Sequence, residues 1–147
     1  MLDFRTEQTY PDAPPEGFCA ELHPGENLFP QFGFGIRMEE YDADPTKGEV
    51  PESINIYKLF IWNSFPYDTI QGKVCLRFLC PGDKIRQGGM SRQVRKLFNQ
   101  RNIPPESRIR CPIVCDDEGI LWIPHLGCRD RAEAGDGKVW LFSYFTL

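Results

Sequence analysis

The amino-acid sequence predicts a globular α+β fold that is rich in short strands and carries one main basic helix. The 147 residues include 3 Trp, 5 Tyr and 11 Phe, and 41% of all residues are hydrophobic, which excludes a disordered chain. Thirteen Gly and thirteen Pro divide the apolar residues into short pieces, as turns between strands do. Residues 91–101, in contrast, repeat their apolar side chains at helical spacing.

The first half of the chain is expected to be a tail followed by strands. Residues 1–16 contain three prolines and predict a linker or tail. Residues 17–71 predict a β-rich segment, in which GFCAELHPGENLFPQFGFGIRMEE (17–40), broken at Pro24-Gly25 and at Pro30, indicates two short strands. After an acidic loop, INIYKLFIW (54–62) predicts a strong strand of β-branched and aromatic residues.

The second half, residues 72–147, is expected to be a separate domain. KVCLRFLCPGDKI (73–85) predicts a strand that runs into a turn at Pro81-Gly82. Ser91 is a good N-cap for a helix that continues to about Arg101.

Three further elements are expected after this helix. PESRIR (105–110) begins with Pro and indicates a short second helix. CPIVCDDEGILWIPHLG (111–127) predicts a hairpin turning at residues 116–119, and GKVWLFSYF (137–145) predicts the last strand.

Charge is distributed unevenly along the chain. Residues 1–72 carry 4 basic and 13 acidic groups, residues 73–110 carry 10 basic and 2 acidic groups, and residues 111–147 carry 3 and 6. The net charge of -4 therefore hides a basic segment. Asymmetry of this kind indicates a polyanionic partner.

The predicted helix has an apolar face and an opposite basic face. At ~100° per residue, Val94, Leu97 and Phe98 fall on one side. Arg92, Arg95, Lys96 and Asn99 fall on the other, with no Asp or Glu among them. A solvated helix face is the structural alternative. Phosphate would supply the missing anion, because arginine can hold its oxygens with two hydrogen bonds.

The residues around the helix extend this hypothesis. Free backbone N–H groups of Gly88–Ser91 are expected to face the same anion, and the Pro81-Gly82-Asp83 turn to aim neighbouring cations at it. Few aromatic residues interleave with the basic ones, so the pattern favours the backbone of a structured nucleic acid over single strands. The predicted contact residues are Lys84, Arg86, Arg92, Arg95, Lys96, Arg101, Arg108 and Arg110.

Two of these residues have a second interpretation. Arg108 and Arg110 follow Pro104-Pro105 at short spacing, and they could equally pair with carboxylates of the C-terminal hairpin. Contact with nucleic acid and a structural ion pair both stay open for them.

The six cysteines are expected to be reduced and structural, because they form no CxxC pair and four of them lie in apolar runs. Cys111, Cys115, His125 and Cys128 raise the question of a zinc site or a Cys–His nucleophile. An extended strand would place Cys111 and Cys115 about 13 Å apart, too far for two ligands of one zinc ion. Packing is the better account, and no metal site or catalytic residue is predicted.

Three sequence blocks together resemble a known family. RFLCPGDKIRQGG (77–89), RKLFNQRNIPPESRIRCPIV (95–114) and GILWIPHLG (119–127) are similar, in order and spacing, to the C-terminal domain of tRNA(Ile)-lysidine synthetase. The strong resemblance covers about residues 72–131, and a weaker one covers 17–71. Gln93, Ile109 and His125 depart from the family pattern, which often has Lys, Asp and Gly at these positions.

The resemblance implies a β-sandwich with helices, shared with a module of the phenylalanyl-tRNA synthetase β chain. It also implies a cytoplasmic parent enzyme that uses ATP and lysine to convert the wobble cytidine of tRNA(Ile), with its CAU anticodon, into lysidine. In the family this chemistry belongs to an N-terminal PP-loop domain bearing S-G-G-x-D-S, a motif that this sequence lacks. The chain is thus expected to be a non-catalytic, tRNA-binding C-terminal portion without a cofactor of its own, and to work with the PP-loop domain.

A second function class stays open. The chain could be a protein-interaction or regulatory module that keeps the fold without binding RNA, with the acidic residues 1–72 docked on a basic partner or on its own basic segment. No apolar run approaches the ~20 residues that span a bilayer, so no membrane partner is expected. Whether the chain forms a homodimer is left open by the sequence.

Overall fold

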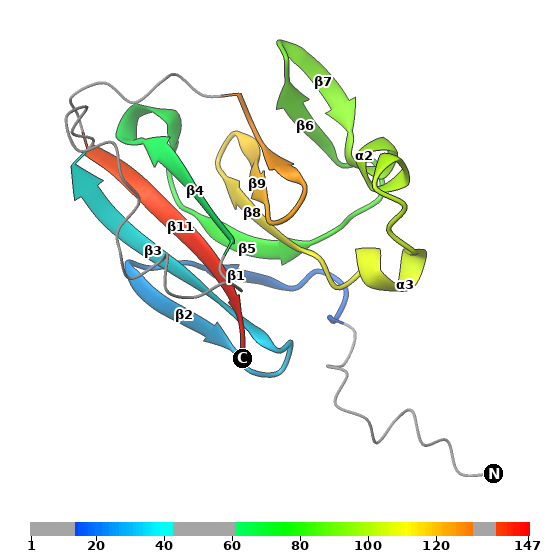
Figure 1. The fold of residues 1–147 in the computed structure, drawn as a ribbon, viewed down its shortest axis with the longest axis horizontal. Coiled ribbons are helices and arrows are strands. Elements are labelled where there is room, and N and C mark those ends of the chain that lie inside the picture. Colours follow the sequence, from blue (N-terminus) through cyan, green and yellow to red (C-terminus); the bar gives the residue numbers. More distant parts are fainter. Residues whose placement is uncertain (1–13, 43–60, 131–137) are drawn as a thin grey trace.

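The computed structural model describes residues 14–42, 61–130 and 138–147, which form an α+β fold dominated by antiparallel strands (Figure 1). The strands of these residues make a five-stranded sheet, a four-stranded sheet and a two-stranded hairpin. This architecture confirms the predicted fold class.

The five-stranded sheet, called the central sheet below, has the strand order β1-β5-β8-β9-β10. The turn between β8 and β9 lies at Asp116–Gly119, where the hairpin was predicted. The strands span Cys19–Glu21 (β1), Cys75–Phe78 (β5), Pro112–Asp116 (β8), Gly119–Ile123 (β9) and Gly127–Cys128 (β10).

The four-stranded sheet, called the outer sheet below, has the order β2-β3-β11-β4. Its last strand in the chain, β11, lies between β3 and β4. A 3-10 turn at Tyr67–Thr69 (η2) follows β4. The strands span Gly25–Phe29 (β2), Phe34–Asp42 (β3), Ile61–Pro66 (β4) and Lys138–Thr146 (β11).

Several predicted strands are confirmed, and others change. Within residues 17–40, where two strands were expected, the structure has three, because Gly25 starts a strand of its own after β1. Of the strand predicted at 54–62, residues 54–60 lie outside the described residues, and β4 begins at Ile61. The predicted last strand is confirmed as β11.

The central sheet is the middle of three layers, because both of its faces are apolar. In β5, Leu76 and Phe78 belong to the core between the two sheets, together with Trp122 of β9 and Phe142 of β11. The other face packs under the hairpin and a helix in a second core. The second core contains Ile85, Val94, Leu97, Phe98, Ile113, Cys115, Ile120, Ile123 and Leu126.

The hairpin and two short helices form the third layer, at the end of the molecule away from the outer sheet (Figure 1). The hairpin pairs Lys84–Gln87 (β6) with Met90–Gln93 (β7), and the helices span Val94–Gln100 (α2) and Pro105–Arg108 (α3). The short second helix was predicted. Among the described residues, no helix is long and apolar enough to span a membrane.

The start of the main helix was predicted two residues too early. Ser91 is part of β7 and does not cap a helix, and α2 begins at Val94. The physical reason is the pair Gly88-Gly89, whose φ angles of 63° and 73° make a two-residue hairpin turn that sends the chain back along β6.

Strand pairs connect the two halves of the chain. Strand β1 pairs with β5, and β11 pairs with β3 and β4, so each sheet combines residues from before and after position 72. The division into a tail (1–16), a β-rich segment (17–71) and a C-terminal domain (72–147) stays a prediction.

Candidate nucleic-acid interface

Helix α2 has the two faces that the sequence predicted. Val94 and Phe98 are 0% exposed and Leu97 is 9% exposed, all within the second core. Arg95 and Lys96 are exposed on the side of the helix that faces away from this core. Burial of the apolar side chains therefore holds these two cations in the solvent.

The hairpin presents basic side chains on both of its faces. Lys84 pairs with Gln93, Ile85 with Arg92, and Arg86 with Ser91. Partners in an antiparallel ladder lie on the same face. Lys84 and Arg86 therefore lie on the face opposite the buried Ile85, whereas Arg92 lies on the face of Ile85 but remains exposed.

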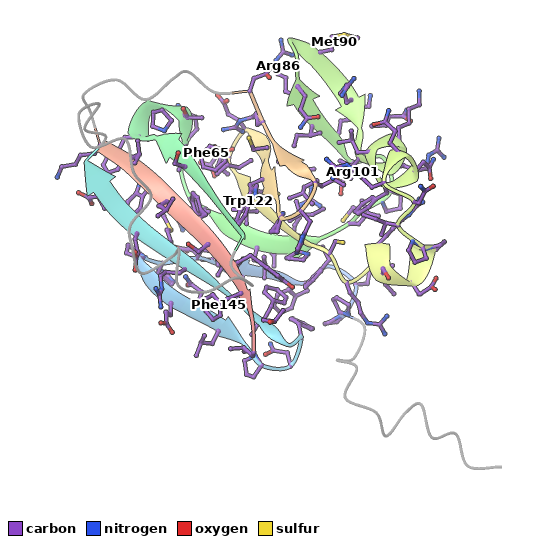
Figure 2. All side chains as sticks on the ribbon, in the orientation of Figure 1. Phe65, Arg86, Met90, Arg101, Trp122 and Phe145 are labelled. Atoms are coloured by element: carbon purple, nitrogen blue, oxygen red, sulfur yellow. The ribbon has the colours of Figure 1, made fainter. Side chains whose placement is uncertain are left out.

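These exposed cations form what we call the basic surface: Lys84, Arg86, Arg92, Arg95, Lys96 and Arg101. Figure 2 shows Arg86 on the hairpin, near the exposed tip residue Met90, and Arg101 closer to the central sheet. Within the described part of the chain, the first five make no hydrogen bond or ion pair through their side chains. Arg101 donates a hydrogen bond of 3.3 Å to the carbonyl of His125.

An ion pair on the central sheet holds the base of this surface. The Arg77 guanidinium donates two hydrogen bonds of 2.9 Å to the carboxylate of Asp83. These bonds hold the pKa of Arg77 above its ordinary value. Asp83 also accepts bonds from the Cys80 N–H (2.7 Å) and, through its carbonyl, from the Val94 N–H (3.0 Å). One residue thus connects strand β5, the turn before β6 and the first residue of α2.

A second carboxylate holds the tip of the hairpin. The N–H groups of Gly88 and Gly89 donate to Asp130 at 2.9 Å and 2.8 Å. Sequence reasoning expected these N–H groups to be free for an anion at the start of the helix. That expectation was wrong, because the glycines form a hairpin turn and their N–H groups bind the protein's own carboxylate.

Residue Arg129, next to Asp130, is anchored in the interior. Its guanidinium donates to both oxygens of Asp116 at 2.8 Å and 2.7 Å and to the Thr69 carbonyl at 2.9 Å. Burial raises the pKa of Asp116, but the bonds from Arg129, Gln71 and Glu118 outweigh it, so this pKa lies below its ordinary value. The pair ties the segment before β5 to the turn between β8 and β9.

Arg108 is used within the protein. Its guanidinium donates to the Ile103 carbonyl and to the Asn99 side chain, both at 2.7 Å, and its centre lies 5.6 Å from the Phe98 ring centroid. It thus joins α3 to the end of α2 through neutral oxygen atoms rather than a carboxylate. Arg110 donates to the Glu106 carbonyl at 3.0 Å. A contact of either arginine with nucleic acid stays a prediction.

The cysteines are free thiols in this structure. Burial raises the pKa of Cys111, and it raises that of Cys115 to about 11, which disfavours the nucleophilic thiolate. Among the described residues, no group of three or more His, Cys, Asp and Glu side chains is placed to hold a metal ion.

His125 adopts a backbone conformation that usually favours glycine. Its φ angle is 71°, at the position where the resembled family has Gly. Its ring packs edge-on against Tyr144 at 5.5 Å, and burial lowers its pKa. The turn before β10 is therefore kept despite the change of residue.

Three residues shape the basic surface without being part of it. The sequence did not indicate Arg77 or Asp130, and it placed Asp83 in a turn without predicting the ion pair that it forms. Asp83 carried a usable signal, since Asp is typical of a turn after Pro-Gly. Asp130 had none, because it lies 41 and 42 residues from the glycines that it binds.

Comparison with known proteins found a matching family model, a curated relative and a solved structure. A model of the family described as "TilS substrate C-terminal domain" matches residues 74–142. The tRNA(Ile)-lysidine synthase of Clostridioides difficile (strain 630) is 36% identical over 59 residues, which are 40% of this chain and 13% of that protein. The chain thus corresponds to a small part of this relative's length.

A solved structure, "Crystal structure of TILS C-terminal domain", has a closely similar fold. It superposes with a TM-score of 0.69 over 88% of this chain and 97% of the other, at 24% sequence identity. At 24% identity, this likeness shows that the two chains share a fold.

Proposed function

We propose, from the match of residues 74–142 to the TilS substrate C-terminal domain family, that the chain is the non-catalytic, tRNA-binding C-terminal part of a cytoplasmic tRNA(Ile)-lysidine synthase. The ligation of lysine to the wobble cytidine of tRNA(Ile), with ATP and lysine as substrates, would belong to a PP-loop domain outside this sequence. The chain would serve that domain by holding the tRNA.

The basic surface is the observation that carries this proposal. Its cations project from the hairpin and α2, and residues 84–105 contain no Asp or Glu that could neutralise them. Holding like charges close together is unfavourable without a counter-ion, and phosphate groups along an RNA backbone supply one. The surface combines one face of a helix with a hairpin. Such a fixed arrangement of cations suits folded RNA, which proteins recognise by its shape and its backbone.

Charge reversal on the helix face tests the proposal. We expect Arg95→Glu combined with Lys96→Glu to weaken tRNA binding strongly, because two phosphate contacts are lost and two repulsive carboxylates are added. The slope of log affinity against log salt should fall by roughly 1.4 to 1.8. Both residues are exposed, so stability should change by only about 0.5 kcal/mol per site. The measurement is tRNA affinity across a salt series, with thermal unfolding alongside.

Lys73→Glu combined with Lys138→Glu is the matched control. It makes the same change in net charge, at two exposed lysines that lie outside the basic surface. Lys73 pairs with Glu21 (3.8 Å) and Lys138 pairs with Glu40 (2.9 Å), and exposed ion pairs of this kind contribute little to stability. Equal loss of affinity in both double variants would mean that only net charge matters. A parent chain that does not bind tRNA at any salt concentration would instead favour the protein-interaction module.

A further inference from the structure

The turn at the tip of the hairpin leaves two backbone donors without a partner inside the hairpin. A two-residue turn with positive φ at both positions points the N–H groups of Gly88 and Gly89 away from the β6–β7 ladder. The two oxygens of Asp130 accept one bond each, Oδ1 from Gly88 at 2.9 Å and Oδ2 from Gly89 at 2.8 Å. A single carboxylate thus satisfies both donors.

Two more bonds connect the segment around Asp130 to strand β6. The Asp130 N–H donates to the Arg86 carbonyl at 2.9 Å, and the Gln87 side chain donates to the Cys128 carbonyl at 3.0 Å. The segment is itself fixed, because the neighbouring Arg129 is held by the buried Asp116. Asp130 therefore projects toward the hairpin from a rigid base.

The hairpin has little else to hold its outer end. Ile85 is its buried side chain, 2% exposed, and all four residues of β7 are exposed. An isolated two-stranded hairpin is marginally stable in water. The bonds of Asp83 act at the opposite end, where the hairpin meets α2. The tip is thus held mainly through residues 128–130.

We propose that Asp130 is a positioning residue, which clamps the β6–β7 hairpin in the orientation that lets the exposed cations of the hairpin and those of α2 bind the same RNA molecule. The inference rests on the proposed tRNA binding. The hydrogen bonds from Gly89 and Gly88 lower the pKa of Asp130, which keeps the carboxylate ionised as an acceptor.

If Asp130 positions the hairpin, its removal should change RNA affinity in the direction opposite to that expected from its charge alone. Asp130 places a negative charge beside the basic surface, so if it acted only as a charge, its removal would strengthen binding to RNA. If it positions the hairpin, its removal weakens binding, because only the fraction of molecules with the hairpin in place binds well. A hairpin that holds this orientation for roughly a tenth of the time lowers the apparent affinity roughly tenfold.

The experiment compares Asp130→Ala and Asp130→Asn with Glu106→Ala, which removes an exposed acid of α3 that makes no side-chain bond to the hairpin in the described structure. Affinity for the tRNA is measured at one salt concentration, with thermal unfolding as a check. We expect a roughly tenfold loss in Asp130→Ala. Asp130→Asn keeps one carbonyl acceptor and should lose less, while Glu106→Ala should bind as tightly as the parent or slightly more tightly.

Nuclear magnetic resonance reports on the clamp without RNA. In Asp130→Ala the amide protons of Gly88 and Gly89 should shift upfield and exchange faster with solvent, whereas Glu106→Ala should leave them unchanged. Where Asp130→Ala does not fold, Asp130→Asn carries both comparisons.

Two outcomes overturn the positioning role alone: an Asp130→Ala variant that binds tRNA as tightly as Glu106→Ala, or glycine amides that do not respond to its loss. A parent chain without affinity for tRNA overturns the proposed function, and this inference falls with it. The tRNA affinity of the parent chain therefore distinguishes the two failures.

Discussion

The buried carboxylate of Asp116 connects several segments of the chain through hydrogen bonds. Its side chain is 0% exposed, and its oxygens accept two bonds from Arg129 and one each from the N–H groups of Gln71 and Glu118. A buried charge is tolerated only when it is paired and fully hydrogen-bonded. These contacts satisfy that condition and join three separate segments.

Replacing Asp116 by Asn should be strongly destabilising. The variant keeps the shape of the side chain but leaves the Arg129 guanidinium, 10% exposed, without its counter-charge. Breaking a buried pair in this way costs roughly 3–5 kcal/mol. Urea unfolding measures the loss, and the exposed neighbour Glu118→Gln, expected to change stability by only about 0.5 kcal/mol, is the control. A loss in Asp116→Asn no larger than in the control would contradict the role assigned to the pair.

The same residue predicts a dependence of stability on pH. The folded pKa of Asp116 lies below the unfolded value of about 3.9, so the folded state favours the ionised form. Its contribution is therefore fully present above the unfolded pKa and is lost as the pH falls through the lower, folded pKa. Unfolding free energies measured from pH 6 to pH 2 should fall more steeply for the parent chain than for Asp116→Asn. Parallel curves would show that Asp116 has no part in the acid sensitivity.

At the scale of elements, helix α2 separates stability from binding on its two faces. Its apolar side chains fill the second core, and its cations face solvent. The helix is only 7 residues long, too short to be stable alone, so packing against the central sheet must maintain it. Changes on the two faces should therefore have opposite consequences.

Leu97→Ala is expected to reduce stability without changing the RNA affinity of the folded molecules. The side chain is 9% exposed and lies in the second core, so its truncation should cost about 2–5 kcal/mol. Denaturant unfolding and tRNA binding under folding conditions test the two parts. Lys96→Ala on the opposite face is the control, with nearly unchanged stability and weaker binding. If Leu97→Ala lowered the affinity of fully folded protein as much as Lys96→Ala, the two faces would not be functionally separate.

The whole molecule places its basic surface at one end and its outer sheet at the other (Figure 1). The central sheet connects them, since each of its faces contributes to a different core. Through the central sheet, the hairpin and α2 are supported by the two-sheet part of the molecule.

This chain alone should form no lysidine. Its sequence contains neither S-G-G-x-D-S, the PP-loop motif of the resembled family, nor G-x-x-x-x-G-K-[ST], the phosphate-binding P-loop. We expect no ATP–pyrophosphate exchange and no incorporation of lysine into tRNA when the chain is incubated with ATP, lysine and tRNA. Detection of either activity, above the level of a heat-denatured sample, would refute a purely binding role.

Local patterns were sufficient for many elements. The apolar positions Val94, Leu97 and Phe98 identified the buried face of α2, and the residues at 116–119 identified the turn between β8 and β9. Local patterns also misled where two signals competed. Ser91 resembles an N-cap, but the preceding Gly88-Gly89 is a hairpin turn, and the strand pairing of β6 with β7 prevailed over the capping signal.

The sequence by itself determined most of the elements, the charge asymmetry, the family resemblance and the two faces of the main helix, because each depends on residues close together in the chain. Only the tertiary structure decided how the basic residues are held. Arg77 and Asp83 meet through a turn, whereas Asp130 reaches Gly88 and Gly89 across more than forty residues. It also decided that Arg108 joins α3 to α2. Such contacts depend on how layers pack, and a pairing between distant residues leaves no periodic trace in one sequence.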